Sequence, residues 1–391
     1  MKRNTSTLLF TLGFLAFWAN GDNYAAAPLL VSIAADLNLG VSTAALSVTA
    51  YMVTFGFFTV LFGPLGDRFG RGRIIKVAAF GTAIFSILGG FAFNFPSLVV
   101  FRGFNGAFAA GIFPVTMALI GEQFSDENRQ GAIARVMGMM FLGGASATAI
   151  GGIIAEFGSW RGVYILYGVA ELILAFIVVR AVPAGKPSDK PFSLFASYRT
   201  ALATPGLAAI VGTIFFVGFA VFGSFSYGGH YVEELTGLPL ILVGLVVTAF
   251  GLGAVAGSRV IPRLRGKLGG AFLPTMGIIG SASLGSLVLT ASVPVMVAGF
   301  FGFGLAFVSL QSTLIMAAQM RLPQLRGTAM SLASFAMFLG GGIGTQVNGI
   351  IIDSVGVSLI YAPAAVFVLL TALVAMRLTR RPVPAAVPAQ A

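Results

Sequence analysis

The sequence predicts an all-α integral membrane protein with twelve transmembrane helices arranged as two six-helix halves. Of its 391 residues, 57% are hydrophobic and only 9% are charged, whereas soluble domains carry about 25% charged residues. Apolar windows of about 20 residues, long enough to cross a bilayer, occur twelve times along the chain. An internal repeat relates the last six windows to the first six. Together these three observations predict the fold class.

Each predicted span is an apolar run that is bounded by polar, glycine or proline residues. The first six spans are residues 7–31, 43–65, 74–93, 97–120, 131–155 and 162–181. The last six are residues 206–228, 239–258, 271–291, 294–317, 327–352 and 357–376. The longest polar connection lies between the two sets. We therefore expect a first half over residues 1–182, a cytoplasmic linker over 183–205, a second half over 206–378 and a flexible tail over 379–391.

The basic residues predict the orientation of these helices. The net charge is +11, and every Lys and Arg except Arg102 and Arg161 falls on the side that holds the N-terminus. This placement follows the positive-inside rule. The basic balance therefore reflects membrane topology, and we expect a lipid bilayer rather than a nucleic acid as partner. We expect a multi-pass, monomeric protein of a bacterial-type inner membrane, with both termini cytoplasmic.

The chain offers few groups for catalysis or metal binding. It has no cysteine and a single histidine, His230, so it cannot form a disulfide, a thiolate metal site or a histidine-based metal centre. The phosphate-binding pattern Gly-x-x-x-x-Gly-Lys-Ser/Thr does not occur, and no nucleophile lies near a base in the sequence. We therefore expect no cofactor and no enzymatic activity.

The repeat is clearest between the fifth and eleventh spans. Residues 129–144 align with residues 326–341, and the match continues at the same offset through the acidic pair Glu156 and Asp353. Two parallel six-helix repeats that face each other are typical of transporters that rock around a midplane site. Both spans contain runs of glycine, which we expect to form packing faces between the halves.

The stretch Gly63-Pro-Leu-Gly-Asp67-Arg-Phe-Gly-Arg71-Gly-Arg73 predicts a tight polar turn between the second and third spans. This stretch resembles the loop between helices 2 and 3 of major facilitator superfamily transporters. The resemblance implies a conformational switch in which Asp67 meets the start of helix 11, here near residues 326–327, where helix amides favour an anion. The expected switch residues are Gly63, Asp67, Arg68, Gly70, Arg71 and Arg73.

Residues 5–378 are similar to the twelve-helix drug–proton antiporters of this superfamily. Helix 4 carries the Arg102-Gly103-x-x-Gly106 pattern. Helix 5 has Ala147-Thr148 where the antiporter motif has Gly-Pro, and His230 replaces a proline in the helix 7 pattern. The resemblance implies export of a small organic compound, drug-like, amphipathic or sugar-like, by proton antiport and alternating access. The change in helix 5 leaves a proton-coupled uptake symporter or facilitator as an alternative, and a non-transporting membrane sensor or scaffold is a third.

Three ionisable residues lie inside predicted spans: Asp22, Arg102 and Glu171. A charge at midspan costs about 2.5–3.5 kcal/mol on insertion scales, so such residues usually mark ion or substrate paths. In the resembled fold, helices 1 and 4 line the cavity, which implies that Asp22 and Arg102 meet there. We expect Asp22, Arg102 and Glu171 to couple protons to transport. The alternatives are a fixed structural ion pair and, for Glu171 on peripheral helix 6, a hydrogen bond to a neighbouring helix.

The expected substrate site combines aromatic side chains with few polar groups, as suits an amphipathic organic molecule. His230 is expected at its outer rim. Taken singly, each of these residues is explained better by packing than by contact with substrate. The other expected substrate-binding residues fall on helices 1, 4, 7 and 10, and are Trp18, Tyr24, Phe104, Asn105, Tyr227 and Gln311.

Overall fold

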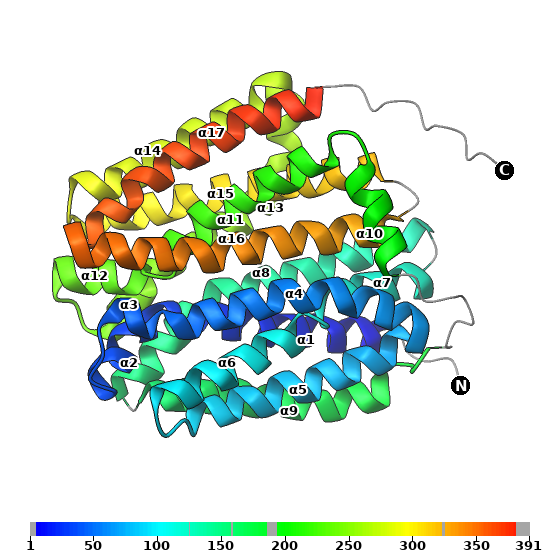
Figure 1. Cartoon of the computed structure of the whole chain (residues 1–391), viewed down its shortest axis with the longest axis horizontal. Helices are drawn as coiled ribbons and strands as arrows, with labels where there is room; N and C mark the ends of the chain where they lie inside the picture. Colours follow the sequence, from blue (N-terminus) through cyan, green and yellow to red (C-terminus); the bar gives the residue numbers. More distant parts are fainter. Residues whose placement is uncertain (1–4, 125, 158, 186–193, 323–324, 381–391) are drawn as a thin grey trace.

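The computed structural model is a bundle of long helices in which α1 begins and α17 ends at the same end (Figure 1). The structure describes residues 5–124, 126–157, 159–185, 194–322 and 325–380, and within these it contains no strand. Eleven helices in the described part are long and apolar enough to cross a membrane. The first predicted span is helical too, but its polar residues Asn20, Asp22 and Asn23 lower its hydropathy. The predicted fold class is confirmed.

In the first half, proline residues mark the breaks within two predicted spans. Pro28 lies in the first turn of the short helix η1 after α1, and Pro114 lies in the first turn of α7, where a missing N–H donor is tolerated. The elements of this half are α1 (Thr5–Ala25), η1 (Ala27–Leu29), α2 (Leu30–Asp36), α3 (Val41–Ala44), α4 (Leu46–Phe69), α5 (Arg71–Gly90), α6 (Phe95–Ala109), α7 (Phe113–Gln123), α8 (Asp126–Phe157) and α9 (Trp160–Ala181).

The second half extends several helices beyond their predicted ends. The expected linker contains a helix, α10, although residues 186–193 of that linker and 381–391 of the expected tail lie outside the described residues. The elements are α10 (Leu194–Ala203), α11 (Leu207–Phe225), α12 (Gly228–Thr236), α13 (Leu240–Leu268), η2 (Gly269–Ala271), α14 (Phe272–Leu289), α15 (Val293–Arg321), α16 (Arg326–Val355), η4 (Val357–Ile360) and α17 (Tyr361–Arg380).

The expected turn over residues 63–73 is mostly helical, so that prediction was wrong in extent. Helix α4 continues to Phe69 with Pro64 inside it, and only Gly70, with φ of +97°, breaks the chain before α5. Pro64 has no N–H, so the carbonyl four residues earlier, on Val60, loses its helical donor. The Tyr198 hydroxyl of α10 donates to that carbonyl at 2.8 Å. The linker helix thus supplies the hydrogen bond that lets the proline remain in the helix.

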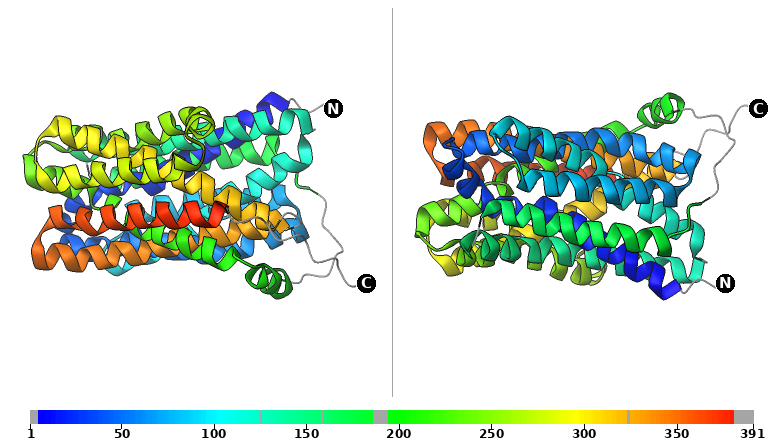
Figure 2. Two further views of the ribbon diagram at one scale, coloured as in Figure 1. Left: turned by 90° about the horizontal axis from the view of Figure 1, so that it is seen from above. Right: turned by 90° about the horizontal axis from the view of Figure 1, so that it is seen from below.

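The two halves pack in equivalent ways, as the repeat predicts. Helix α8 lies along α1 within the first half, and α16 lies along α11 within the second. Between the halves, α8 packs on α13 and α16 packs on α4 (Figure 2). We expected the glycine runs to pack between the halves, but some of these glycines pack within one half. Gly143 contacts the backbone of Phe17 inside the first half, and Gly340 contacts the backbone of Phe215 inside the second. Gly152 does contact α13 of the other half.

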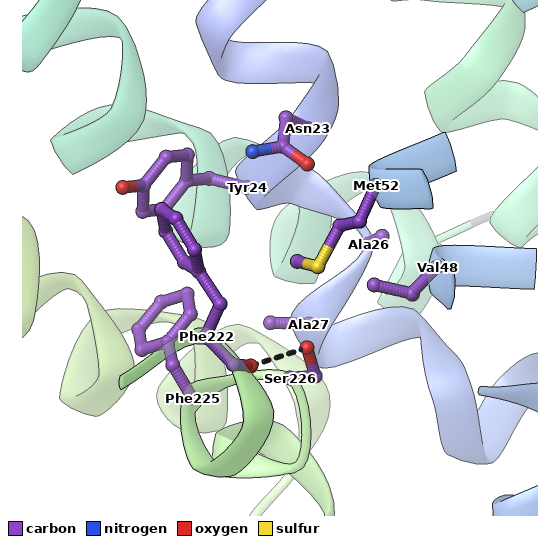
Figure 3. Close-up of a pocket in the computed structure, with 9 residues that line it drawn as sticks. All are labelled: Asn23, Tyr24, Ala26, Ala27, Val48, Met52, Phe222, Phe225 and Ser226. Atoms are coloured by element: carbon purple, nitrogen blue, oxygen red, sulfur yellow. Dashed lines mark hydrogen bonds between the residues drawn. The ribbon is translucent and has the colours of Figure 1, made fainter. Parts of the chain in front are cut away.

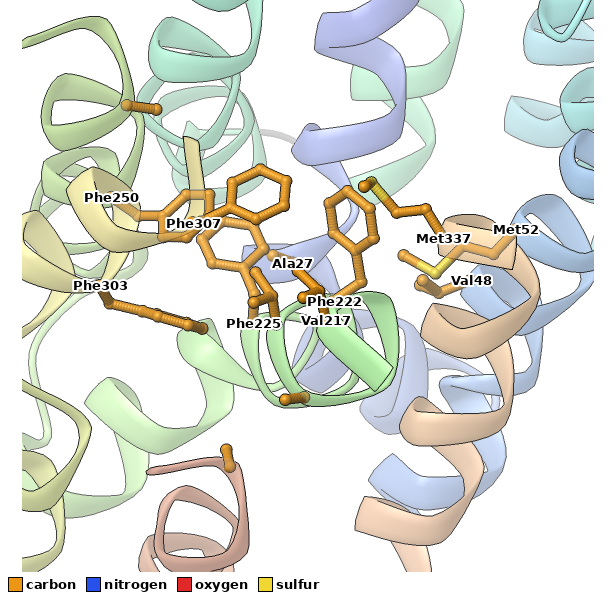
Figure 4. Packing of buried hydrophobic residues seen from close by; sticks show 14 of the residues in the cluster. Ala27, Val48, Met52, Val217, Phe222, Phe225, Phe250, Phe303, Phe307 and Met337 are labelled. Atoms are coloured by element: carbon orange, nitrogen blue, oxygen red, sulfur yellow. The ribbon is translucent and has the colours of Figure 1, made fainter. Parts of the chain in front are cut away.

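Aromatic side chains fill the centre where the halves meet (Figure 4). Phe225 and Phe250 are 4.3 Å apart between ring centroids, and Phe250 is 5.1 Å from Phe303. Met52 of α4 joins this cluster from the first half. Buried aromatic rings contribute large apolar areas, so this cluster provides apolar contact in the middle of the molecule.

Candidate functional site: a buried ion pair beside an inter-half pocket

The first feature of the site is an ion pair in the interior of the first half. Arg102 Nη1 on α6 donates to Asp22 Oδ1 on α1 at 3.0 Å, and both side chains are 1% exposed. The structure therefore brings together the two residues that the sequence expected to meet. A buried charge pair costs desolvation energy, which close approach and further hydrogen bonds offset.

Aromatic rings surround the guanidinium group of Arg102. Its Cζ atom lies 4.5 Å from the ring centroid of Tyr51 and 4.9 Å from that of Tyr164, within the range of cation–π attraction. The Nε and Nη2 atoms of Arg102 have no hydrogen-bond partner. Gly106 lets α6 approach this closely, because a Cβ atom there would lie 2.8 Å from the Tyr51 Cα atom. The ring faces therefore take the place of two hydrogen bonds.

Asn105, which we expected to contact substrate, instead belongs to the ion-pair network. Its Oδ1 atom accepts from Arg102 Nη1 at 2.9 Å. Its Nδ2 atom donates to the backbone oxygen and the hydroxyl of Thr82, at 2.9 and 3.1 Å. Asn105 is fully buried. It therefore fixes the position of Arg102 relative to α5.

A second carboxyl group, that of Glu171 on α9, lies in the same region. Glu171 is 0% exposed, and neither carboxyl oxygen has a hydrogen bond of normal geometry. Its electrostatic neighbours are Asp22, Arg102 and Thr82. Thr82, on the neighbouring helix α5, acts on Glu171 as a side-chain hydrogen-bond donor, so the alternative of a hydrogen bond to a neighbouring helix remains. Two acidic groups share one basic group in this cluster.

The second feature is a small pocket where the halves meet (Figure 3). The volume in which the centre of a water molecule fits is about 10 Å³, which is roughly room for a single water and too little for an organic ligand. The Oδ1 atom of Asn23 has no hydrogen-bond partner, whereas the Ser226 hydroxyl donates to the carbonyl of Phe222 at 2.7 Å. The lining residues are Asn23, Tyr24, Ala26, Ala27, Val48, Met52, Phe222, Phe225 and Ser226.

The expected substrate residues of α1 divide between the two features. Tyr24 lines the pocket, and its ring centroid lies 5.5 Å from that of Phe225. Trp18 packs edge-on against Tyr167 at 5.2 Å, beside the ion pair. The sequence reasoning missed Asn23, whose polarity within an apolar helix was the available indication.

The remaining expected substrate residues lie elsewhere. Tyr227 is buried and donates to the Thr345 carbonyl at 3.0 Å. Gln311 on α15 lies 3.2 Å from the sulfur of Met337. His230 on α12 pairs with Glu234, Nε2 to Oε2 at 3.0 Å.

Phe104 is a correction to the expected substrate site. It is 49% exposed and stacks on Phe85 of α5 at 4.8 Å. This places it on the outer surface of the bundle, away from Arg102 and from the pocket.

The expected switch residues lie at the end of the bundle where α1 begins. Arg71 Nη2 pairs with Asp67 Oδ1 at 2.8 Å, and Arg71 Nη1 lies 3.3 Å from Glu122 Oε1 and 2.6 Å from the Ala118 carbonyl. Asp67 therefore joins α4 to α5, and Arg71 joins both to α7. Among the described residues, the expected contact of Asp67 with the start of α16 near residues 326–327 is absent, which is a correction.

Two of the other switch residues, Gly70 and Arg73, pack against the segment after α9. The Arg73 amide donates to the Ala184 carbonyl at 3.1 Å, and a Cβ atom on Gly70 would lie 2.6 Å from that carbonyl oxygen. Gly63 faces α16, because a Cβ atom there would lie 3.4 Å from the Ser331 hydroxyl oxygen. Arg68 lies over the ring of Phe69 at 5.7 Å.

Helix α8 differs from the antiporter pattern at a contact between the halves. The Thr148 hydroxyl lies 2.9 Å from the Thr248 hydroxyl of α13. Each threonine thus finds a polar partner across the contact between α8 and α13. A proline at position 148 would remove this hydrogen bond.

Comparison with known proteins places these features in a family context. The family model described as Major Facilitator Superfamily matches residues 12–345. The chain is 26% identical over 348 residues to the uncharacterized MFS-type transporter YceJ of Bacillus subtilis, covering 85% of this chain and 86% of that one. It is 29% identical over 289 residues to the multi-drug resistance efflux pump PmrA of Streptococcus pneumoniae, covering 68% and 70%.

A solved structure has a similar fold. The crystal structure of a bacterial homolog of the human lysosomal transporter Spinster, in an inward-facing and unoccupied conformation, aligns with a TM-score of 0.77 at 18% identity. The alignment covers 98% of this chain and 100% of that one. At this identity the likeness shows the fold.

Proposed function

Because the chain belongs to the major facilitator superfamily and is a multi-pass membrane transporter rather than an enzyme, we propose that it exports a small organic compound in exchange for protons. The observation that carries this proposal is the buried pair of Asp22 and Arg102. A titratable pair inside a membrane domain usually marks an ion path, and several relatives are named as drug efflux pumps.

The proposed coupling runs along α1. A proton that binds to Asp22 removes the counter-ion of Arg102, which then retains Asn105 and the rings of Tyr51 and Tyr164. The change in attraction alters the balance between two positions of α1 relative to α6. The residues that follow Asp22 on α1 line the pocket. Protonation and substrate binding therefore act on one helix.

The driving force is adequate for export. A proton that crosses 100 mV releases about 2.3 kcal/mol, and each unit of pH difference adds about 1.36 kcal/mol. The substrate class that suits the pocket is an amphipathic molecule, because the lining combines aromatic rings with the amide of Asn23 and the hydroxyl of Ser226. Rearrangement of the halves enlarges this site in the proposed cycle.

Proton-coupled uptake on the same fold is the second candidate function. It is favoured by one observation, the contact of Thr148 with Thr248, since the exporter-associated Gly-Pro is absent from helix 5. In both candidates we place the protein in a bacterial-type inner membrane as a monomer, with both termini cytoplasmic.

The test is transport by the purified full-length protein in liposomes with an imposed pH gradient, screened against a panel of organic compounds. Export predicts that at least one compound moves out of the compartment that holds the protein's N-terminal side as protons enter it. Movement of compound and protons in the same direction would instead establish uptake. Compound movement that ignores the gradient in all cases would refute proton coupling.

A further inference from the structure

The carboxyl group of Glu171 has no role in the ion pair, although it is buried beside it. We propose that Glu171 holds the coupling proton while Asp22 is paired with Arg102, so that two carboxyl groups exchange one proton around a single guanidinium. This inference rests on the proposed proton coupling and names the residue that carries the proton in this conformation.

The surroundings of Glu171 favour its neutral form. It is 0% exposed, and its one hydrogen-bonding neighbour among the described residues is the Thr82 hydroxyl, at a geometry outside the limits of a normal hydrogen bond. A buried carboxylate with one weak donor and no cation bonded to it is far less stable than a protonated carboxyl group. Arg102, the one cation near it in the described part of the chain, already bonds Asp22 at 3.0 Å. One positive charge therefore neutralises one of the two carboxyl groups, and the other retains its proton.

Arg102 has the donors that a second carboxylate needs. Its Nη1 atom is engaged with Asp22 and Asn105, but its Nε and Nη2 atoms have no hydrogen-bond partner. Arg102 interacts electrostatically with Glu171, so a guanidinium group with unused donors has a second carboxyl group in its surroundings. A guanidinium group can bind a carboxylate through two parallel N–H bonds. Arg102 can therefore exchange one acid partner for the other without a change of side chain.

The exchange conserves both protons and charge. In one arrangement Asp22 is a carboxylate bonded to Arg102, and Glu171 is protonated. In the other, the proton has moved to Asp22, and Glu171 is the carboxylate bonded to Arg102. The three groups have a net charge of zero in both arrangements, so neither leaves an unpaired charge in the membrane interior.

Tyr167 provides a hydroxyl group that interacts with both acids. It precedes Glu171 by one turn of α9, and its hydroxyl has no hydrogen-bond partner. It interacts electrostatically with both Asp22 and Glu171. Gly21 makes this approach possible, because a Cβ atom there would lie 2.7 Å from Tyr167 Cε1 and 3.3 Å from its hydroxyl oxygen. The hydroxyl can accept and donate a proton as the two acids change roles.

The ionisable groups that face this cluster come from four helices. Asp22 comes from α1, Tyr51 from α4, Arg102 from α6, and Tyr164 and Tyr167 from α9. The tyrosines are neutral at physiological pH. The charge of the cluster therefore depends on the two acids and Arg102.

Infrared spectroscopy of the purified full-length protein in liposomes at pH 7 tests the assignment, because only a protonated carboxyl group shows the C=O stretch of a carboxylic acid. We expect Glu171→Gln to lose one such band relative to the wild type. Arg102→Gln should gain one, because neither acid then has a cation. Asp353→Asn is the matched control: Asp353 is exposed at the end of a repeat helix, and its removal should leave the band unchanged.

The result that overturns the proposal is a carboxylic acid band in Glu171→Gln equal to that of the wild type, or an Arg102→Gln spectrum that gains two such bands. The Arg102→Gln spectrum tests the proposal even if Glu171→Gln does not fold. As a functional readout, Glu171→Gln should keep substrate exchange without a gradient but lose gradient-driven accumulation, and Glu171→Asp should restore part of it. Because the infrared result does not depend on transport direction, failure of proton-coupled export and failure of the Glu171 assignment can be told apart.

Discussion

Replacement of Asp22 by asparagine tests the central part of the mechanism. At 3.0 Å, two unit charges attract by about 5.5 kcal/mol at an effective dielectric constant of 20. Removal of one partner of a buried pair costs about 3–5 kcal/mol. The rings of Tyr51 and Tyr164 and, in our proposal, Glu171 compensate Arg102 in part. We therefore expect Asp22→Asn to lose no more than about 3 kcal/mol of stability and to remain folded.

The effect on transport should be much larger than the effect on folding. A pH difference of one unit supplies about 1.36 kcal/mol per proton, which corresponds to a tenfold concentration ratio for one-to-one exchange. In liposomes with this gradient, the wild type should produce about a tenfold substrate ratio. Asp22→Asn should not accumulate substrate, so that its concentration ratio stays near one, while it retains substrate exchange in the absence of a gradient.

The control and the refuting outcome follow from the same assay. Asp353→Asn removes an exposed acid at the repeat-related helix and should transport like the wild type. A tenfold ratio produced by Asp22→Asn would end the proton-carrier hypothesis. A purely structural ion pair also predicts that the charge swap of Asp22 and Arg102 restores folded yield, which can be measured in parallel.

Three further changes probe other contacts. Asp67→Asn removes an exposed partner of Arg71, worth about 1 kcal/mol or less, so expression should persist while turnover falls up to about fivefold; unchanged turnover would count against a switch role. Gly72→Ala adds a methyl group against the backbone that follows α9 and should lower stability by about 1–3 kcal/mol, measured by thermal unfolding in detergent, where an unchanged melting temperature would contradict the packing. Arg161 lowers the pKa of Asp36 by hydrogen bonding. The folding stability that this pair contributes is therefore present above about pH 4 and is lost as the pH falls further. Thermal unfolding of Asp36→Asn should lack this acid-dependent loss of stability.

Hydropathy predicted the helices but not their breaks. The turn at residues 63–73 shows why, because Pro64 suggested an end to α4 that a hydrogen bond from Tyr198 prevents. That donor lies more than a hundred residues away, and no local pattern announces it. By contrast, the pairing of Asp22 with Arg102 could be predicted, because the family resemblance places helices 1 and 4 at one cavity and each charge in the membrane needs a partner.

The side of a membrane helix on which a residue lies was harder to predict than the helix itself. Phe104 and Asn105 are neighbours on α6, yet one faces outward and the other is fully buried. Lipid tails are as apolar as a protein core, so an aromatic residue suits either surface, and periodicity does not separate them. The contact of Asp67 depends in addition on how the two halves are placed, which sequence spacing does not determine.

The hydroxyl of Tyr198 has a wider consequence for how the polypeptide is connected. Helix α10 packs on α11 and α16 of the second half, while its tyrosine is bonded to the Val60 carbonyl of the first. Covalent continuity is therefore not the only tie between the halves at this end. If the chain were divided within residues 186–193 and its two pieces produced together, α10 would still dock on the proline-containing helix. We therefore expect the two pieces to associate, with this phenolic hydrogen bond as one of the contacts between them.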